Sequence, residues 1–249
     1  MGIKQILVRF RNIFVGLSIK CRQKTYNNRL HYIFNDNGSD RLLIVFSAFG
    51  GEKPTYNYMR TLRNVKADQL FVLDDFGYRG SYYWFENGDS RPSELVRGLI
   101  RQVLDSKKYS DVRTIGSSKG GSCAIYYGLE IGAKEIYAGA CQYYVGNYLY
   151  TDKHMRIFKS MMGEAASMPA CDELNGMLPK QICKFESSMS VVNLLYSKNE
   201  HTYDEHIIHL LEDLQKTNIA VREIIKDFTN HSDVGQHFSL YLKQELNNI

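Results

Sequence analysis

The most constraining feature of the sequence is a glycine- and serine-rich segment at residues 112–124, Val-Arg-Thr-Ile-Gly-Ser-Ser-Lys-Gly-Gly-Ser-Cys-Ala. Its first residues are typical of a β-strand, and small residues follow where a helix would begin. A strand that turns this tightly into a helix strains one residue and needs small neighbours two positions before and after it. Gly116 and Gly120 meet that need around Ser118. The segment predicts a nucleophile elbow, Gly116-Ser117-Ser118-Lys119-Gly120, with Ser118 as its nucleophile.

Two other interpretations of this segment are less well supported. One is an ordinary glycine-rich turn between a strand and a helix, with Ser118 in a structural role. The other is a phosphate-binding loop, which needs four residues between its first glycine and a Gly-Lys pair, and a Ser or Thr after the lysine. The segment has neither feature.

The rest of the chain alternates short apolar runs with helical patterns, which is typical of a mostly parallel sheet covered by helices on both faces. With 249 residues, one such domain with an insertion is expected. The predicted fold class is an α/β-hydrolase-like three-layer sandwich spanning residues 26–249. The predicted strands are 31–34, 42–47, 70–73, 112–115, 135–138, 191–196 and 221–225. The predicted helices are 56–63, 93–105, 119–131, 203–214 and 234–246.

A serine nucleophile needs a histidine to accept its proton and an acid to orient that histidine, and in this fold the chain order is serine, acid, histidine. Glu200 stands in the turn after the predicted strand 191–196 and is the first choice for the acid, with Asp204 second. His231 follows the last predicted strand and is preferred over His237, which falls a turn into the closing helix. A solvated loop acid remains the alternative for either carboxylate.

The developing oxyanion needs two backbone N–H donors, one after the nucleophile and one from the loop after an earlier strand. Lys119 would supply the first. The second is expected from Phe49 or Gly50, in the segment Ala48-Phe49-Gly50-Gly51 that follows a buried run. An ordinary turn is the alternative for these two glycines.

An aromatic segment at residues 74–87 follows the predicted strand 70–73 and contains the only tryptophan. It is expected at the carboxyl edge of the sheet, where Ser118 is also expected. Aromatic faces beside carboxylates and amides suit sugar rings, so Tyr82 and Trp84 are candidate substrate contacts. It is an equally good interpretation that the aromatic side chains of this segment pack inward and form a small secondary core.

A stretch at about residues 139–190 lacks a clear strand and is rich in methionine and tyrosine. An insertion at this point of a doubly wound sheet would lie over the carboxyl ends of the strands, where ligands bind. It is either a candidate lid or a helical pair packed on the surface.

The N-terminal residues 1–25 contain six lysines and arginines and no acid, which leaves the rest of the chain mildly acidic. Apolar residues at helical spacing predict a basic amphipathic helix here, which could contact the inner face of a membrane or dock on protein. No apolar run approaches the about 20 residues of a membrane span. Five scattered cysteines without metal-site spacing favour a reducing cytoplasm, and neither nucleic acid, metal nor cofactor is expected.

Several motifs give the chain a family resemblance. They are Phe46-Ser47-Ala48-Phe49-Gly50, residues 56–62, Leu73-Asp74-Asp75-Phe76-Gly77, Gly80-Ser81-Tyr82-Tyr83, Glu86-Asn87 and Gly116–Gly121. With these, residues 40–150 resemble the XcbB/CpsF-type capsular polysaccharide biosynthesis proteins, relatives of the α/β-hydrolase-like component of the accessory Sec system. The resemblance implies an α/β-hydrolase fold and a place in bacterial surface-polysaccharide assembly.

Two functions follow as hypotheses. The first is a serine esterase or acyltransferase that acts on a capsular or related glycan, using Ser118, His231 and Glu200. The second is a non-catalytic scaffold that binds glycan or other capsule-assembly proteins. The sequence leaves hydrolysis and acyl transfer equally open.

Overall fold

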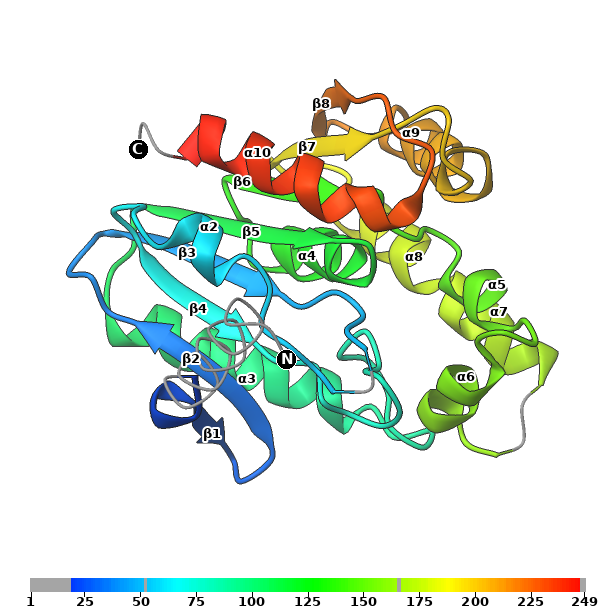
Figure 1. Cartoon of the computed structure of the whole chain (residues 1–249), viewed down its shortest axis with the longest axis horizontal. Coiled ribbons are helices and arrows are strands. Elements are labelled where there is room, and N and C mark those ends of the chain that lie inside the picture. Colours follow the sequence, from blue (N-terminus) through cyan, green and yellow to red (C-terminus); the bar gives the residue numbers. More distant parts are fainter. Residues whose placement is uncertain (1–18, 52, 165–166, 247–249) are drawn as a thin grey trace, which may run out of the picture.

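The computed structural model describes residues 19–51, 53–164 and 167–246, and in this part the chain forms an eight-stranded sheet (Figure 1). The order across the sheet is β1-β2-β4-β3-β5-β6-β7-β8. β1 and β2 pair antiparallel with their neighbours, and every later pair is parallel. The strands are β1 (Lys24–Tyr26), β2 (Leu30–Asn35), β3 (Arg41–Phe46), β4 (Asp68–Val72), β5 (Asp111–Ser117), β6 (Glu135–Gly139), β7 (Val191–Tyr196) and β8 (Ala220–Ile225).

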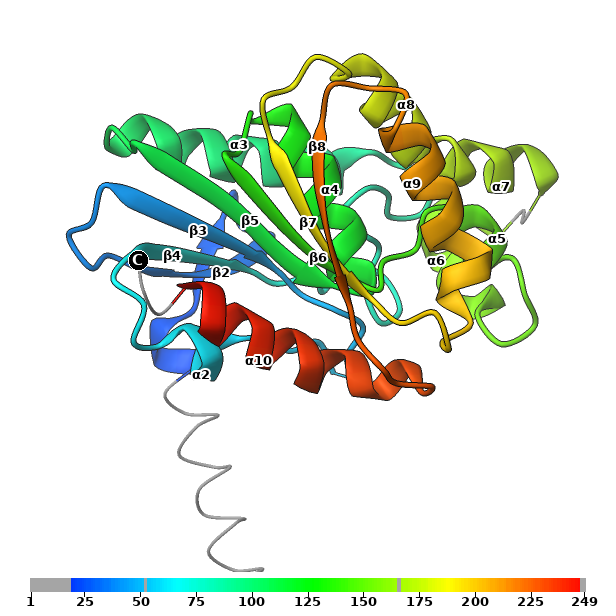
Figure 2. The ribbon, with the colours of Figure 1, turned by 90° about the horizontal axis from the view of Figure 1, so that it is seen from above.

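Helices cover both faces of the sheet, as Figure 2 shows edge-on. One face carries α3 (Arg91–Ser106), α4 (Lys119–Glu130), α8 (Met177–Lys184) and α9 (Ile208–Leu214). The other face carries α2 (Met59–Leu62) and α10 (Val234–Leu246).

The core is divided by the sheet into two layers, because successive residues of a strand point to opposite faces. In β3, Ile44 and Phe46 join the apolar cluster beneath α3 and α4, whereas Leu43 and Val45 join the cluster beneath α10. Burial on both faces explains why β3 reads as a continuous apolar run. The three-layer α/β fold class predicted from the sequence is confirmed.

The insertion between β6 and β7 is helical, as its lack of strand pattern predicted. It consists of α5 (Val145–Leu149), α6 (Met155–Met162), α7 (Met168–Asn175) and α8. The first three gather beyond the carboxyl ends of the strands (Figure 1), and α8 returns to pack on α4. The insertion thus has four helices, more than the helical pair that was one of its two predicted forms.

Backbone contacts bind α6 to the aromatic segment 74–87. The N–H groups of Asn87 and Gly88 donate to the carbonyls of Ser160 and Met161, over 2.9 and 2.7 Å. The insertion and this segment consequently form one wall at the carboxyl edge of the sheet.

The N-terminal amphipathic helix predicted for residues 1–25 falls mostly outside the described residues. Residues 19–22 are helical, but Lys24–Tyr26 form β1, so the predicted range extends too far. Among the described helices, none is long and apolar enough to cross a membrane.

Candidate active site

The turn from β5 to α4 places Ser118 at the carboxyl edge of the sheet in a strained conformation, with φ 52° and ψ −128°. Glycine is required on both sides of it. A Cβ atom at Gly116 would lie 2.0 Å from the carbonyl oxygen of Gly120, and one at Gly120 would lie 2.6 Å from that of Phe46. These approaches are too close for any side chain, so the sequence can form this turn only with glycines here. The geometry is that of a nucleophile elbow.

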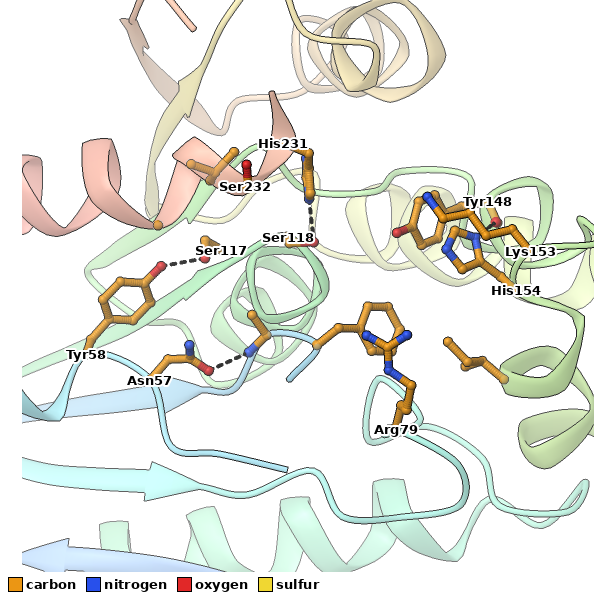
Figure 3. Close-up of a pocket in the computed structure, with 15 residues that line it drawn as sticks. Asn57, Tyr58, Arg79, Ser117, Ser118, Tyr148, Lys153, His154, His231 and Ser232 are labelled. Atoms are coloured by element: carbon orange, nitrogen blue, oxygen red, sulfur yellow. Dashed lines mark hydrogen bonds between the residues drawn. The ribbon is translucent and has the colours of Figure 1, made fainter. Parts of the chain in front are cut away.

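His231 approaches Ser118 from the chain after β8 (Figure 3), and Glu200, from the turn after β7, contacts the other nitrogen of the His231 ring. His231 opens the short 3₁₀ turn after β8, and its Nε2 lies 2.8 Å from Ser118 Oγ. Its Nδ1 lies 3.1 Å from Oε1 of Glu200, which stands in the turn after β7. Serine, histidine and carboxylate thus form one continuous chain of hydrogen bonds.

Glu200 is held as a carboxylate. Its side chain is fully buried, which opposes ionisation, but hydrogen bonds from His231 and Thr202 and the charges of nearby histidines outweigh burial and lower its pKa. His201 Nδ1 lies 2.7 Å from the same Oε1 atom. A buried anion in this place orients the His231 ring, and it is the arrangement that could stabilise an imidazolium if His231 accepted a proton.

The two alternative residues considered from the sequence lie elsewhere. His237 stacks on Phe228, with ring centroids 5.0 Å apart. Asp204 is exposed in the π-helix Tyr203–Ile207. Neither makes a hydrogen bond to Ser118 or His231.

Two backbone N–H groups beside Ser118 make no hydrogen bond within the described chain, those of Lys119 and Phe49. The neighbouring N–H of Ala48 is used differently, because it donates to Asn57 Oδ1 over 2.9 Å. Phe49 lines the pocket in front of Ser118, whereas Gly50 does not. Of the two residues named for the second donor, Phe49 is therefore the better placed.

The Lys119 side chain is fully buried beneath the elbow. Its Nζ lies 2.6 Å from Oδ2 of Asp74, also fully buried, and 4.8 Å from the ring centroid of Tyr83. Asp74 Oδ2 further accepts from the N–H of Ser81 at 2.8 Å. This ion pair ties the first residue of α4 to the segment that follows β4.

Gln142, which follows β6, was missed by the sequence analysis. Its Nε2 donates to Ser118 Oγ over 3.1 Å, and its Oε1 accepts from the Tyr82 hydroxyl over 3.2 Å. In parallel sheets, functional residues commonly lie just after the carboxyl ends of the strands. This rule points to Gln142 as well as to Glu200 and His231.

The structure corrects the expectation for Tyr82 and Trp84 as substrate contacts. Both side chains are completely buried, stack on each other with centroids 5.2 Å apart, and lie outside the pocket lining. Both belong to the apolar cluster beneath α3 and α4, so they form the inward-packed alternative, with the Tyr82 hydroxyl bonded to Gln142. The polarity of the surrounding residues suggested a sugar site, but the aromatic rings are used as core.

A pocket of about 380 Å³ opens in front of Ser118. The insertion contributes Tyr148, Lys153, His154 and Ile157 to its lining. The remaining lining residues come from the loops at the strand ends, the last residue of β5 and the start of α10, and are Ala48, Phe49, Asn57, Tyr58, Arg79, Ser117, Ser118, His231, Ser232, Val234 and Gly235. The position of the insertion is therefore that expected of a lid.

No protein-family model matches the chain, and no curated protein matches it. Solved structures do match the chain. A capsule O-acetyltransferase of Neisseria meningitidis serogroup A superposes with a TM-score of 0.77 at 22% identity, covering 91% of this chain and 94% of that one. A fluorophosphonate-binding serine hydrolase of Staphylococcus aureus, FphF, superposes with a TM-score of 0.63 at 11% identity, covering 91% and 96%.

The chain has the α/β-hydrolase fold. Its match to the glycosylation-associated protein complex Gap123 of Streptococcus agalactiae has a TM-score of 0.71 at 18% identity, and covers 91% of this chain and 46% of that one. These neighbours have the α/β-hydrolase fold that the resemblance drawn from the sequence motifs implied. The α/β-hydrolase fold also accounts for the chain order of Ser118, Glu200 and His231.

Proposed function

We propose that this protein is a serine acyltransferase that moves an acetyl group from a coenzyme A thioester to a hydroxyl of a bacterial capsular or related glycan. The observation that carries the proposal is the Ser118–His231–Glu200 chain, with 2.8 Å between Ser118 Oγ and His231 Nε2. The acyl donor and acceptor are taken from the neighbouring capsule O-acetyltransferase, one structure of which is described as a complex with CoA.

In the first half-reaction, Ser118 Oγ attacks the thioester carbonyl while its proton passes to His231 Nε2. The N–H groups of Lys119 and Phe49 stabilise the oxyanion that forms on the carbonyl oxygen. The carbon–sulfur bond then breaks, and His231 returns the proton to the departing thiolate. The acetyl group remains on Ser118 as an ester.

In the second half-reaction, a glycan hydroxyl loses its proton to His231 and attacks the ester carbonyl. The bond between the acyl carbon and Ser118 Oγ breaks, and the proton returns to Ser118. Water can replace the glycan hydroxyl in the same step, which would make the protein an esterase. The neighbouring capsule O-acetyltransferase, one structure of which holds CoA, supports transfer rather than hydrolysis.

Incubation with isotopically labelled acetyl-CoA and de-O-acetylated capsular polysaccharide tests the proposal. The wild type should transfer label to the polysaccharide, and Ser118→Ala and His231→Ala should each reduce transfer by about 10³-fold or more. His237→Ala is the matched control and should retain transfer. Binding of glycan without transfer by the wild type would favour the scaffold alternative.

We also propose that the protein works in the cytoplasm, where it meets capsule-assembly proteins at the inner face of the membrane. The support is the basic amphipathic pattern of residues 1–25. Flotation with anionic liposomes should fall when these residues are deleted. Equal flotation of the truncated protein would exclude membrane contact through this segment.

A further inference from the structure

The pocket in front of Ser118 has a cationic mouth. Its fifteen lining residues include Arg79 and Lys153 and contain no aspartate or glutamate. Within the described chain, neither cation forms a salt bridge. Figure 3 shows Arg79 entering from the segment after β4 and Lys153 from the insertion, on different sides of the pocket. A site lined in this way favours an anionic ligand.

Arg79 is held in place by the fold. Its backbone has φ 64°, which is unusual for a residue with a side chain, and its Nη2 donates to the carbonyl of Gly50 over 2.8 Å. Its Nε atom is buried and has no hydrogen-bond partner among the described residues. The guanidinium is thus anchored through Nη2 while its remaining donors make no hydrogen bond among the described residues, which suits it to an anion that arrives with the ligand.

The charges of these two residues also act on the neighbouring ring of His154. Burial lowers the pKa of His154, and the charges of Lys153 and Arg79 lower it further. A neutral imidazole next to two fixed cations leaves the positive charge of the mouth on Arg79 and Lys153 alone.

The size of the pocket places the anion relative to the nucleophile. A volume of about 380 Å³ lies at the lower end of small-ligand sites, so it admits the acyl group and an arm of limited length. The charged end of a larger reactant stays at the mouth. Arginine with spare donors and a nearby lysine are the residues that bind phosphate most often in proteins.

We infer that Arg79 and Lys153 form a phosphate subsite that holds the phosphate groups of the acyl donor while its thioester reaches Ser118. The inference rests on the proposed function for the identity of the donor. The same chemistry would fit a phosphate carried by the glycan acceptor, and the experiment separates the two sources.

The test is calorimetric binding to the full chain, with CoA and with pantetheine, which has the same thiol arm but no phosphate. Arg79→Gln and Lys153→Gln should each weaken CoA binding by about tenfold or more relative to pantetheine. Lys180→Gln, an exposed lysine of α8 in the same insertion, is the matched control and should leave the ratio unchanged. Rising salt should reduce the preference of the wild type for CoA.

Three results would overturn the inference. The first is a wild type that binds CoA no better than pantetheine. The second is an unchanged ratio in both variants. The third is weakened binding of a phosphate-bearing glycan by the variants while CoA binding stays the same, which would assign the subsite to the acceptor. Tight CoA binding that depends on Arg79, without acetyl transfer, would uphold the subsite and contradict the proposed function.

Discussion

The side-chain amide of Gln142 donates a hydrogen bond to the hydroxyl oxygen of Ser118 over 3.1 Å. The same oxygen lies 2.8 Å from His231 Nε2, so it is held between a donor and the proposed proton acceptor. The amide is itself fixed by the Tyr82 hydroxyl. Gln142 is thus placed to orient Ser118 Oγ and to stabilise the negative charge that grows there as the proton leaves.

Gln142→Leu should lower kcat by about tenfold and change KM little, because the lost hydrogen bond is strongest when Ser118 Oγ carries negative charge. Steady-state kinetics with acetyl-CoA measure both constants. Gln181→Leu is the matched control, since Gln181 is also buried but donates to the Tyr126 carbonyl, outside the site. A rise in KM without a fall in kcat would contradict this role.

The buried pair of Lys119 and Asp74 gives a prediction for stability. Lys119→Met removes one partner and leaves the Asp74 carboxylate buried without its cation, which should cost about 3–5 kcal/mol of the free energy of unfolding. The double variant Lys119→Met/Asp74→Leu should recover much of that loss. Urea unfolding measures all three proteins.

The pair of exposed Lys216 and half-buried Asp213 is the control for this prediction. Lys216→Met should change the free energy of unfolding little, since water screens the pair. A Lys119→Met protein as stable as the wild type would show that the buried ion pair does not hold the elbow.

His206 gives a prediction for pH dependence. Its side chain is 2% exposed, its Nε2 has no hydrogen-bond partner in the described chain, and burial lowers its pKa to about 4. Because the unfolded chain binds this proton at the ordinary histidine pKa, near 6.5, and the folded chain only near 4, stability falls as the pH drops through that window.

The full effect of His206 is about 3 kcal/mol. His206→Gln should therefore reduce the loss of unfolding free energy between pH 7 and pH 4.5. His209→Gln, which changes a more exposed histidine on the adjacent helix, should not. Equal acid sensitivity of the wild type and His206→Gln would refute the prediction.

Sequence reasoning could locate the strands and the elbow because their physical causes are local. Continuous apolar runs mark strands buried on both faces, and the close approach at Gly116 and Gly120 admits only glycine. The strand β1 was missed because its three residues are mostly exposed and polar, and its pairing with β2 is decided by the chain reversal between them. The described structure also brings Glu200 and His231 to Ser118, which the chain order had suggested.

The burial of Tyr82 and Trp84 and the contacts of Gln142 and Asp74 depend on tertiary packing, which the sequence patterns did not reveal. Tyr82 and Trp84 have the composition of a sugar site, but their burial depends on α4 and the insertion, which are distant in sequence. The contacts of Gln142 with Ser118, and of Asp74 with Lys119, join residues 24 and 45 positions apart. The position of Gln142 just after a strand can be singled out from the sequence, but the partner of its side chain cannot.

The most direct test of the account is whether Ser118 is a reactive nucleophile. A fluorophosphonate probe, followed by peptide mapping, should label Ser118 in the wild type and in Ser117→Ala, and should fail to label Ser118→Ala and His231→Ala. Labelling of Ser117→Ala matters because Ser117 stands next to the nucleophile but bonds to Tyr58. A folded wild type that takes up no probe, or one whose labelling survives Ser118→Ala, would contradict the claim that Ser118, His231 and Glu200 act together in catalysis.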